Sequence, residues 1–364
     1  MIKRIEIEGY KSIRDLSLDL KPVNILLGGN GVGKSNFISL FTLIRNIYNH
    51  NFQNYVQSKG GADSLLHFGK KNTNRINLKL YFGNEYSTKN VFDIIIQEAQ
   101  DTLILKSIGT AFQNYHGDWY PREFESNVRE SDFANIQDNQ AYYVNKYLKD
   151  FDVYHFHDTG DKSPMKGMSD LHDNTELRRN GSNSASLLYY LQEKHPKHFK
   201  RIELTIRSIA PFFDHFVLQP NRLNENKIQL EWREQGHPET YFSAYDLSDG
   251  TLRFICLTTL LMQPNPPSTI IIDEPELGLH PVAINKLAAL VGKCSEESQI
   301  ILSTQSTNLV DNFEPEDIIV TDRKRDGEST FRRLEGEALT QWLSDYTLSE
   351  LWGQNKIGAQ PYYN

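Results

Sequence analysis

The hydrophobic pattern of the first 48 residues predicts strands, a glycine-rich turn and a helix, in that order. Apolar and polar residues alternate over Ile2–Ile7 and Leu16–Leu20, which is typical of half-buried strands. Val23–Leu27 is a mainly apolar run of the kind that a buried strand shows. After the glycines of positions 28–33, apolar residues recur at helical spacing: Phe37, Ile38, Phe41, Leu43, Ile44 and Ile47.

Three apolar runs between residues 75 and 110 predict an antiparallel meander. The runs are Ile76–Phe82, Val91–Ile96 and Thr102–Ile108. Residues 121–150 are predicted to form polar helix, and Val153–His157 a short strand. Residues 158–183 are rich in Asp, Gly, Ser and Asn, which indicates a loop.

The second half of the chain mixes helical and strand patterns, which indicates an α/β fold. The predicted helices are Ser184–Lys194, Phe199–Phe213, Gly250–Met262 and Pro281–Val291. The predicted strands are Phe216–Gln219, Ile228–Trp232, Tyr241–Tyr245, Thr269–Ile272, Gln299–Ser303 and Asp317–Thr321. No long heptad repeat is present, so we expect no extended coiled-coil arm.

The composition excludes wholesale disorder and a uniformly basic protein that coats DNA. Hydrophobic residues make up 38% of the chain, charged residues 24%, and the net charge is −8. Any contact with DNA must therefore use a local patch, although solvated surface charge is the favoured interpretation of each candidate. The candidates are Lys3, Arg4, Lys11 and Arg14; Lys70, Lys71 and Arg75; and Arg323, Lys324 and Arg325.

The two cysteines, Cys256 and Cys294, lack metal-ligand spacing and are predicted to be buried thiols in a reducing cytosol. The N-terminal segment alternates like a strand and lacks the apolar core of a signal peptide. The longest apolar stretch, Phe254–Met262, is too short to span a bilayer. We therefore expect a cytoplasmic protein with no membrane partner.

The strongest motif is Gly28–Ser35, which matches G-x-x-x-x-G-K-[ST] in full. Its glycines allow the backbone N–H groups to turn inward around phosphate oxygens, and the following helix adds its N-terminal dipole. Lys34 is predicted to reach the β- and γ-phosphates of ATP, and Ser35 to bind Mg²⁺. A buried strand before the motif and an amphipathic helix after it favour this interpretation over a chance glycine turn.

A second acidic site is predicted at Thr269–Pro275, where an apolar strand ends in two carboxylates. Ligands bind at the carboxyl ends of strands in open α/β sheets. Asp273 is therefore placed to hold Mg²⁺, directly or through water, and Glu274 to orient or deprotonate the attacking water. The alternative is an ordinary turn with solvent-facing acids.

Two further segments resemble a known class of ATPase. Leu247–Thr251 resembles the L-S-G-G-Q signature of ABC-type ATPases, and Asp273–Pro281 resembles the Walker B and D-loop segment of RecF/SMC-like and OLD-like ATPases. More narrowly, the chain is similar to small bacterial AAA family ATPases with an ABC-type head. The segments Gly9–Ile13, Gln57–Phe68 and Tyr346–Gly353 fit this resemblance.

The resemblance implies an α/β P-loop NTPase fold, an ABC-type ATPase head with a mixed sheet and an inserted, partly helical lid. It divides the chain into 1–110 and 216–364, which form the ATPase lobe, and the insert 111–215. ATP and Mg²⁺ are the implied cofactors. The nucleotide contacts would be Asn30, Gly31, Gly33, Lys34, Ser35 and Asn36, with Ser248 and Gly250 from a second subunit. Ser35, Asp273 and Gln57 are the candidate metal contacts, and Glu274, Lys34 and Gln305 the candidate catalytic residues.

The sequence departs from the family pattern at three positions. Asp249 replaces the first glycine of the signature, and Thr251 replaces its glutamine. Gln305 stands where the switch segment normally carries histidine, which predicts slow hydrolysis rather than loss of binding. Gln57 as the Q-loop residue and Ser248 as an interface residue each have a simpler alternative. These are a surface position for Gln57 and a helix N-cap for Ser248.

His155 and His157 share one face of a predicted strand, but no third metal ligand is evident, so a structural role is favoured. Two functions remain open. One is a Mg²⁺-dependent ATPase that forms a homodimer, or a higher even oligomer, around ATP and acts in DNA repair or another DNA-associated process. The other is an ATPase scaffold of an anti-phage defence system that controls a separate nuclease or toxin effector. A transporter subunit fits the D-loop segment poorly.

Overall fold

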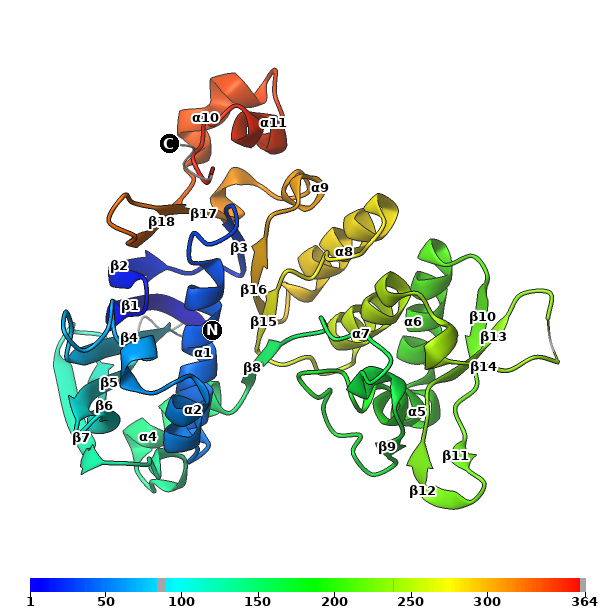
Figure 1. Cartoon of the computed structure of the whole chain (residues 1–364), viewed down its shortest axis with the longest axis horizontal. Coiled ribbons are helices and arrows are strands. Elements are labelled where there is room, and N and C mark those ends of the chain that lie inside the picture. Colours follow the sequence, from blue (N-terminus) through cyan, green and yellow to red (C-terminus); the bar gives the residue numbers. More distant parts are fainter. Residues whose placement is uncertain (84–88, 238, 361–364) are drawn as a thin grey trace. The chain divides into compact units, whose positions relative to one another are not determined.

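The computed structural model describes residues 1–83, 89–237 and 239–360, and the chain divides into two compact units. Unit 1 comprises Met1–Asp152, Pro267–Ile271 and Ser298–Asn364, and unit 2 comprises Val153–Pro266 and Ile272–Glu297. Each unit is therefore assembled from segments that are far apart in the sequence (Figure 1). Among the described residues, no helix has both the length and the apolar character needed to cross a bilayer.

One sheet of unit 1 is entirely antiparallel, with the strand order β2-β1-β4-β5-β6-β7. Its strands are β1 (Ile2–Tyr10), β2 (Ile13–Asp19), β4 (Arg75–Gly83), β5 (Lys89–Ala99), β6 (Thr102–Gln113) and β7 (Trp119–Val128). The predicted meander is confirmed. The prediction of helix from residue 121 is wrong, because Pro121–Val128 pair with β6 as an edge strand. This strand has no buried residue, so it lacks the apolar alternation that marks a half-buried strand.

The second sheet has the order β18-β17-β3-β16-β15-β8, and it belongs to unit 1 except for the last two residues of β8 and of β15, which fall in unit 2. Its strands are β3 (Val23–Leu27), β8 (Phe151–Tyr154), β15 (Thr269–Asp273), β16 (Gln299–Thr304), β17 (Ile318–Arg323) and β18 (Ser329–Arg333). β3 pairs in parallel with β16 and β17, whereas β18 is antiparallel to β17. The predicted mixed sheet is therefore confirmed, and β3 lies inside it with all five residues buried.

Helix α1 (Lys34–Tyr48) supplies much of the core of unit 1, and its helical spacing is confirmed. The Phe37 ring lies 5.4 Å from the Phe331 ring, and the Phe41 ring 6.2 Å from the Phe151 ring. Shorter helices complete the unit: α2 (Phe52–Ser58), α3 (Ala62–Leu65), η1 (Phe133–Asn135), α4 (Asn139–Leu148), α9 (Thr307–Val310), η4 (Pro315–Asp317), α10 (Gly336–Leu343) and α11 (Leu348–Gly353).

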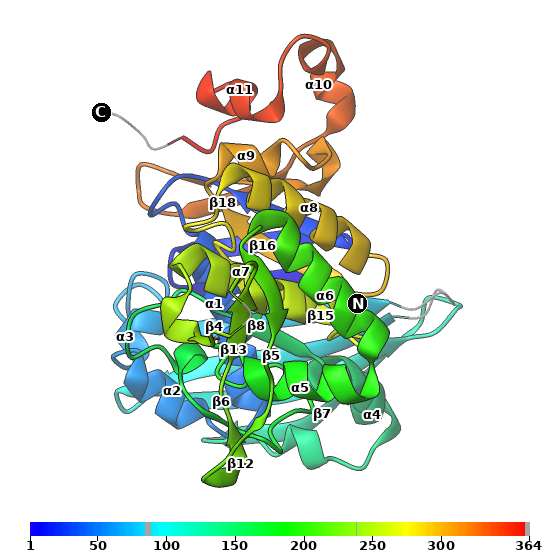
Figure 2. The same cartoon turned by 90° about the vertical axis from the view of Figure 1, so that its right-hand side faces the viewer.

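Unit 2 is built around helix α7, which packs against three other helices (Figures 1 and 2). The helices are α5 (Ser184–Lys194), α6 (Pro196–Ile209), α7 (Asp249–Met262) and α8 (Pro281–Cys294), with the single turns η2 (Pro164–Lys166) and η3 (Ala244–Asp246). The strands are β9 (Ser169–Asp170), β10 (Phe213–Phe216), β11 (Pro220–Asn221), β12 (Asn224–Ile228), β13 (Glu231–Glu234) and β14 (Phe242–Ser243). Nearly every residue of α7 is buried, which explains its apolar sequence.

Two strand predictions in unit 2 are wrong. Phe216–Gln219 is not a strand, because β10 ends at Phe216 and β11 begins only at Pro220. Ile228–Trp232 is not a single strand, because Ile228 pairs with β9 and β11, whereas Trp232 pairs with β10 and β14 in a different three-stranded sheet. The apolar residues at the two ends of this segment therefore belong to two different sheets. Cys256 and Cys294 are not joined in a disulfide, and both are buried, as predicted.

Candidate functional site

The glycine-rich loop of unit 1 adopts a backbone that most residues avoid. Gly31 has a φ of 77° and Gly33 a φ of 118°, both in the left-handed region that favours glycine. A Cβ atom at Gly33 would lie 2.1 Å from Ser329 Oγ, so the loop has no room for a side chain there. Helix α1 begins directly afterwards, with no side-chain cap and no acidic residue in its first turn. Its first N–H groups therefore provide an anion site at the end of the loop.

Lys34 is held against the start of this loop. Its Nζ donates to the carbonyl oxygens of Gly28, at 2.7 Å, and Gly29, at 2.9 Å, and the residue is only 4% exposed. Asn30, Gly31 and Ser35 are exposed to solvent. This combination of a buried ammonium group, left-handed glycines and exposed loop residues fits a bound triphosphate.

The side chain of Asn36, another predicted nucleotide contact, is turned toward the β1–β2 connection. Its Nδ2 donates to Ser12 Oγ at 2.7 Å. Ser12 Oγ also lies 2.7 Å from Ser329 Oγ, and Ser329 N donates to the Ser12 carbonyl. The Asn36 side chain therefore helps to anchor the start of α1. The predicted contact of Asn36 with phosphate is thus left to its backbone N–H group.

The turn between β17 and β18 holds two carbonyl groups of the loop. Arg323 Nη1 donates to the Gly31 carbonyl at 3.0 Å, and Ser329 Oγ is 2.6 Å from the Val32 carbonyl. These contacts orient the intervening peptide groups, so Arg323 and Ser329 are part of the site although the motif does not contain them. The sequence offered only a basic stretch at Arg323, and it offered no signal for Ser329.

Two further predicted residues lie in unit 1. Thr304, the last residue of β16, is paired in register with Leu27, so Gln305 follows it at the level of Gly28. Gln305 is half-buried and precedes α9, whose N-cap is Ser306. Gln57 is exposed near the end of α2. The parallel register therefore places Gln305 beside the start of the phosphate loop.

The signature segment belongs to unit 2, where Ser248 is the N-cap of α7. Its Oγ accepts from Thr251 N at 3.2 Å, so the predicted capping role is confirmed. A Cβ atom at Gly250 would lie 2.4 Å from the Gly278 carbonyl oxygen. The glycine is therefore required by the close approach of the turn that follows β15.

The acidic pair also lies in unit 2, at the end of β15. The Asp273 carbonyl is 2.7 Å from His157 Nε2, and Glu274 has a φ of 44°, in the left-handed region. Arg253 Nε donates to the Phe156 carbonyl at 2.8 Å, and burial lowers the pKa of Arg253. This network fixes the segment around His157 to the end of β15.

The structure thus groups Ser248, Gly250, Asp273 and Glu274 in unit 2. The His155 and His157 rings are 6.2 Å apart, and no set of three His, Cys, Asp or Glu side chains among the described residues is arranged to hold a metal ion. His157 contacts a backbone carbonyl instead.

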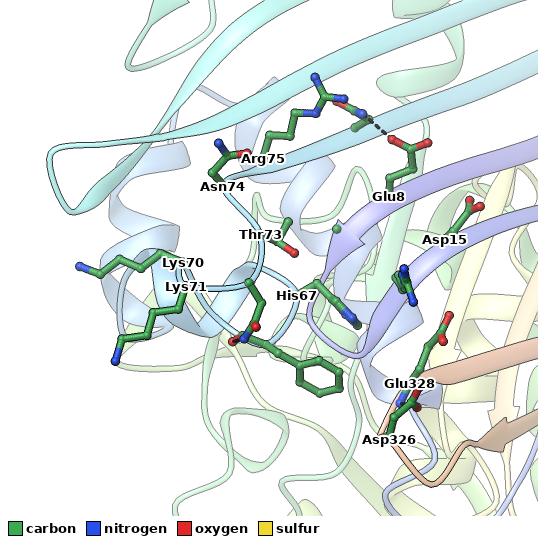
Figure 3. Close-up of a pocket in the computed structure, with 15 residues that line it drawn as sticks. Glu8, Asp15, His67, Lys70, Lys71, Thr73, Asn74, Arg75, Asp326 and Glu328 are labelled. Atoms are coloured by element: carbon green, nitrogen blue, oxygen red, sulfur yellow. Dashed lines mark hydrogen bonds between the residues drawn. The ribbon is translucent and has the colours of Figure 1, made fainter.

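A cavity of about 850 Å³ in unit 1 has walls of mixed charge (Figure 3). Its cationic residues are Arg14, Lys70, Lys71 and Arg75, and its acidic residues are Glu8, Asp15, Asp326 and Glu328. In Figure 3 the side chains of Lys70 and Lys71 extend away from the acidic groups. Parts of two basic stretches therefore line one cavity without forming a uniformly positive surface.

Lys11 lies in the turn that carries Ser12 and contacts α1. Its Nζ donates to Ser39 Oγ at 2.8 Å, and its backbone has a φ of 47°. Burial, followed by the charge of Lys59, lowers the pKa of Lys11 from 10.5 to about 8. The charged form of this side chain is therefore disfavoured where it contacts α1.

We predict that raising the pH from about 8 to about 10 increases the free energy of unfolding of the parent relative to Lys11→Met. Between these values the unfolded chain holds more protons at this position than the folded chain, so stability rises with pH. Urea denaturation at both pH values measures the difference, with the exposed Lys106→Met as the control. An equal parent-minus-variant difference at the two values would contradict the prediction.

Comparison with known proteins places this geometry in a family. The model of the AAA_21 family, described as "AAA domain, putative AbiEii toxin, Type IV TA system", matches residues 23–311. A search of curated proteins finds no match.

Two solved Smc head structures resemble the chain. One is the SmcHead bound to the C-winged helix domain of ScpA, with a TM-score of 0.58 and 16% identity, covering 93% of this chain and 99% of that one. The other is the Smc head domain with an extended coiled coil bound to the C-terminal domain of ScpA, from Pyrococcus furiosus. Its TM-score is 0.55 and its identity 15%, with 94% of this chain and 98% of that one covered.

At this level of identity the structural likeness shows the fold, and it confirms the predicted P-loop fold of an ABC-type ATPase head. The family match spans most of the chain, including the phosphate loop, the signature segment and the acidic strand. The protein belongs to the AAA_21 family of P-loop ATPases.

Proposed function

We propose that this protein binds MgATP on its phosphate loop and hydrolyses it slowly, as a dimer that closes around the nucleotide. The observation that carries the proposal is the geometry of the loop. Gly31 and Gly33 are left-handed, α1 begins without a cap or an acid, and Lys34 is buried at the start of the loop. Together these features form a cradle for phosphate oxygens.

In this proposal Lys34 moves from its two carbonyl partners to the β- and γ-phosphates, and the N–H groups of Asn30, Gly31, Gly33 and Asn36 bind phosphate oxygens. Ser35 and Asp273 hold Mg²⁺, with Gln57 as a further candidate contact. The bound metal neutralises charge on the phosphates.

Glu274 orients or deprotonates the attacking water in this proposal. Gln305 can hydrogen-bond the γ-phosphate or the water, but a neutral amide cannot usefully accept a proton. A glutamine at this position therefore supports slow turnover.

Ser248 and Gly250 would act across the dimer, on the γ-phosphate held by the other copy. Ser248 is exposed, and it precedes the N–H groups that open α7, a helix of 14 residues. Such a helix start favours an anion. The backbone at Gly250 is fixed by the Gly278 turn, so this segment would be presented as a rigid surface.

We predict that Ser248→Arg abolishes an ATP-dependent dimer, because a bulky side chain would block the opposed phosphate. Mass photometry with MgATP measures the dimer, and Ser208→Arg, on the exposed side of α6, is the control. Mixing Ser248→Arg with Lys34→Ala should restore one composite site per dimer and part of the phosphate release. No recovery in the mixture would contradict action in trans.

Two biological roles remain candidates for this ATPase. The family description names a toxin of a toxin–antitoxin system, which supports a role in such a system, and in this role the protein would control an effector protein. In that case the protein should co-purify with the product of a neighbouring gene, a nuclease or a toxin. For a DNA-associated role, duplex DNA should stimulate phosphate release in a salt-dependent manner.

A further inference from the structure

The C-terminal part of the chain is hydrogen-bonded to the phosphate loop. Gly29 N donates to the Ala359 carbonyl at 3.1 Å, and Trp352 Nε1 donates to the same oxygen at 3.1 Å. Ala359 is fully buried and Trp352 is only 8% exposed. One carbonyl oxygen therefore joins the loop to the end of α11, away from solvent.

The segment that carries this carbonyl is held in one conformation. Ala359 has a φ of 64°, which an alanine adopts only where its surroundings impose it. Asp322 Oδ1 accepts from Ala359 N at 2.6 Å, and a Cβ atom at Gly358 would lie 2.8 Å from Asp322 Oδ2. Arg332 Nη2 donates to the Ile357 carbonyl at 3.0 Å. The two strands β17 and β18 thus fix the segment against the loop.

Gly29 links this segment to Lys34. Its N–H group donates to Ala359, while its carbonyl accepts from Lys34 Nζ at 2.9 Å. If Lys34 turns to a phosphate, the Gly29 carbonyl loses its hydrogen-bond donor. The hydrogen bond from Gly29 N to the Ala359 carbonyl then sets the orientation of Gly29. The contact also lies directly before Asn30, Gly31 and Gly33, whose N–H groups we propose as phosphate contacts.

We infer that Trp352 and Asp322 are positioning residues for nucleotide binding, acting through the Ala359 carbonyl on the phosphate loop. The inference rests on the proposed function. Because such coupling is reciprocal, a nucleotide on the loop also tightens the C-terminal segment. All of the residues that hold Ala359 lie beyond residue 311, outside the part of the chain that the family model matches.

The preceding helix, α10, carries a second tryptophan near this segment. Helix α10 has no buried residue, and Trp342 on it is 42% exposed. Lys356, between α11 and Ala359, lies over the Trp342 ring at 5.2 Å. The Trp342 side chain therefore provides a matched control of the same residue type that does not touch the loop.

The test compares Trp352→Phe and Asp322→Ala with Trp342→Phe in the full-length chain. Trp352→Phe keeps an aromatic ring but removes the N–H donor, and Asp322→Ala removes the anchor of Ala359. Calorimetry should show MgATP binding about three- to tenfold weaker in both variants, the scale of one lost buried hydrogen bond, and unchanged in Trp342→Phe. Nucleotide should also change the tryptophan emission of the parent and of Trp342→Phe, but not that of Trp352→Phe.

Melting curves identify any variant that fails to fold. Because the two variants remove different contacts, one folded variant is enough to test the inference. Parent-like MgATP affinity in a folded Trp352→Phe or Asp322→Ala, with an emission change that persists in Trp352→Phe, overturns the inference alone. Absence of MgATP binding by the folded parent overturns the proposed function, and this inference with it.

Discussion

Replacing Lys34 with alanine should weaken MgATP binding by at least about 100-fold. The ammonium group lies 2.7 Å from the Gly28 carbonyl and 2.9 Å from the Gly29 carbonyl, at the start of the phosphate loop. Hydrogen bonds to charged groups contribute about 1.5–3 kcal/mol each, so losing two of them to phosphate corresponds to at least about 3 kcal/mol. Each 1.4 kcal/mol is roughly a tenfold change in affinity.

Isothermal titration calorimetry on folded protein measures this loss, and Lys106→Ala is the matched control. Lys106 is also a lysine of unit 1, but it is exposed on β6 and bonded to Asn127. Since Lys34 is buried, circular dichroism must show that the variant is folded before its binding is interpreted. MgATP uptake equal to that of the parent would remove the basis of the proposed function.

Changing Glu274 to glutamine should lower steady phosphate release by about 100- to 1,000-fold while MgATP binding is retained. A positioned general base typically contributes rate factors of about this size. The substitution keeps the length and shape of the side chain, and an amide cannot take the proton from the attacking water. The variant should therefore accumulate as an ATP-bound dimer.

Single-turnover release of labelled phosphate is the suitable measurement, since Gln305 predicts a slow parent enzyme. Glu297→Gln, an exposed acid just beyond α8, is the control and should match the parent. Hydrolysis by Glu274→Gln at the parent rate would show that another group activates the water.

The phosphate loop could be predicted from the sequence because its properties are local. Glycines at 31 and 33 allow the left-handed backbone, and the apolar spacing of residues 34–48 determines the helix that follows. The cap at Ser248 is local in the same sense, since its Oγ reaches the N–H group three residues later. Each of these depends on contacts between near neighbours in the chain.

The prediction of helix at residues 121–128 was wrong for a non-local reason. This segment becomes strand β7 because β6 provides its pairing partner, and its exposed edge position leaves no apolar pattern to read. The prediction of one strand at Ile228–Trp232 was wrong for a similar reason, because the two ends of this apolar run pair with strands of different sheets. Strand pairing of this kind outweighs local propensity.

The sequence by itself determined the P-loop fold class, the phosphate loop and the acidic strand end, because each is specified by contiguous residues. Only the tertiary structure decided what holds that loop. Arg323 and Ser329 bind it from 292 and 297 positions away, and Ala359 reaches Gly29 from the last described segment of the chain. Hydrogen bonds to backbone carbonyl and N–H groups require no particular partner side chain, so such contacts leave no pattern in the sequence.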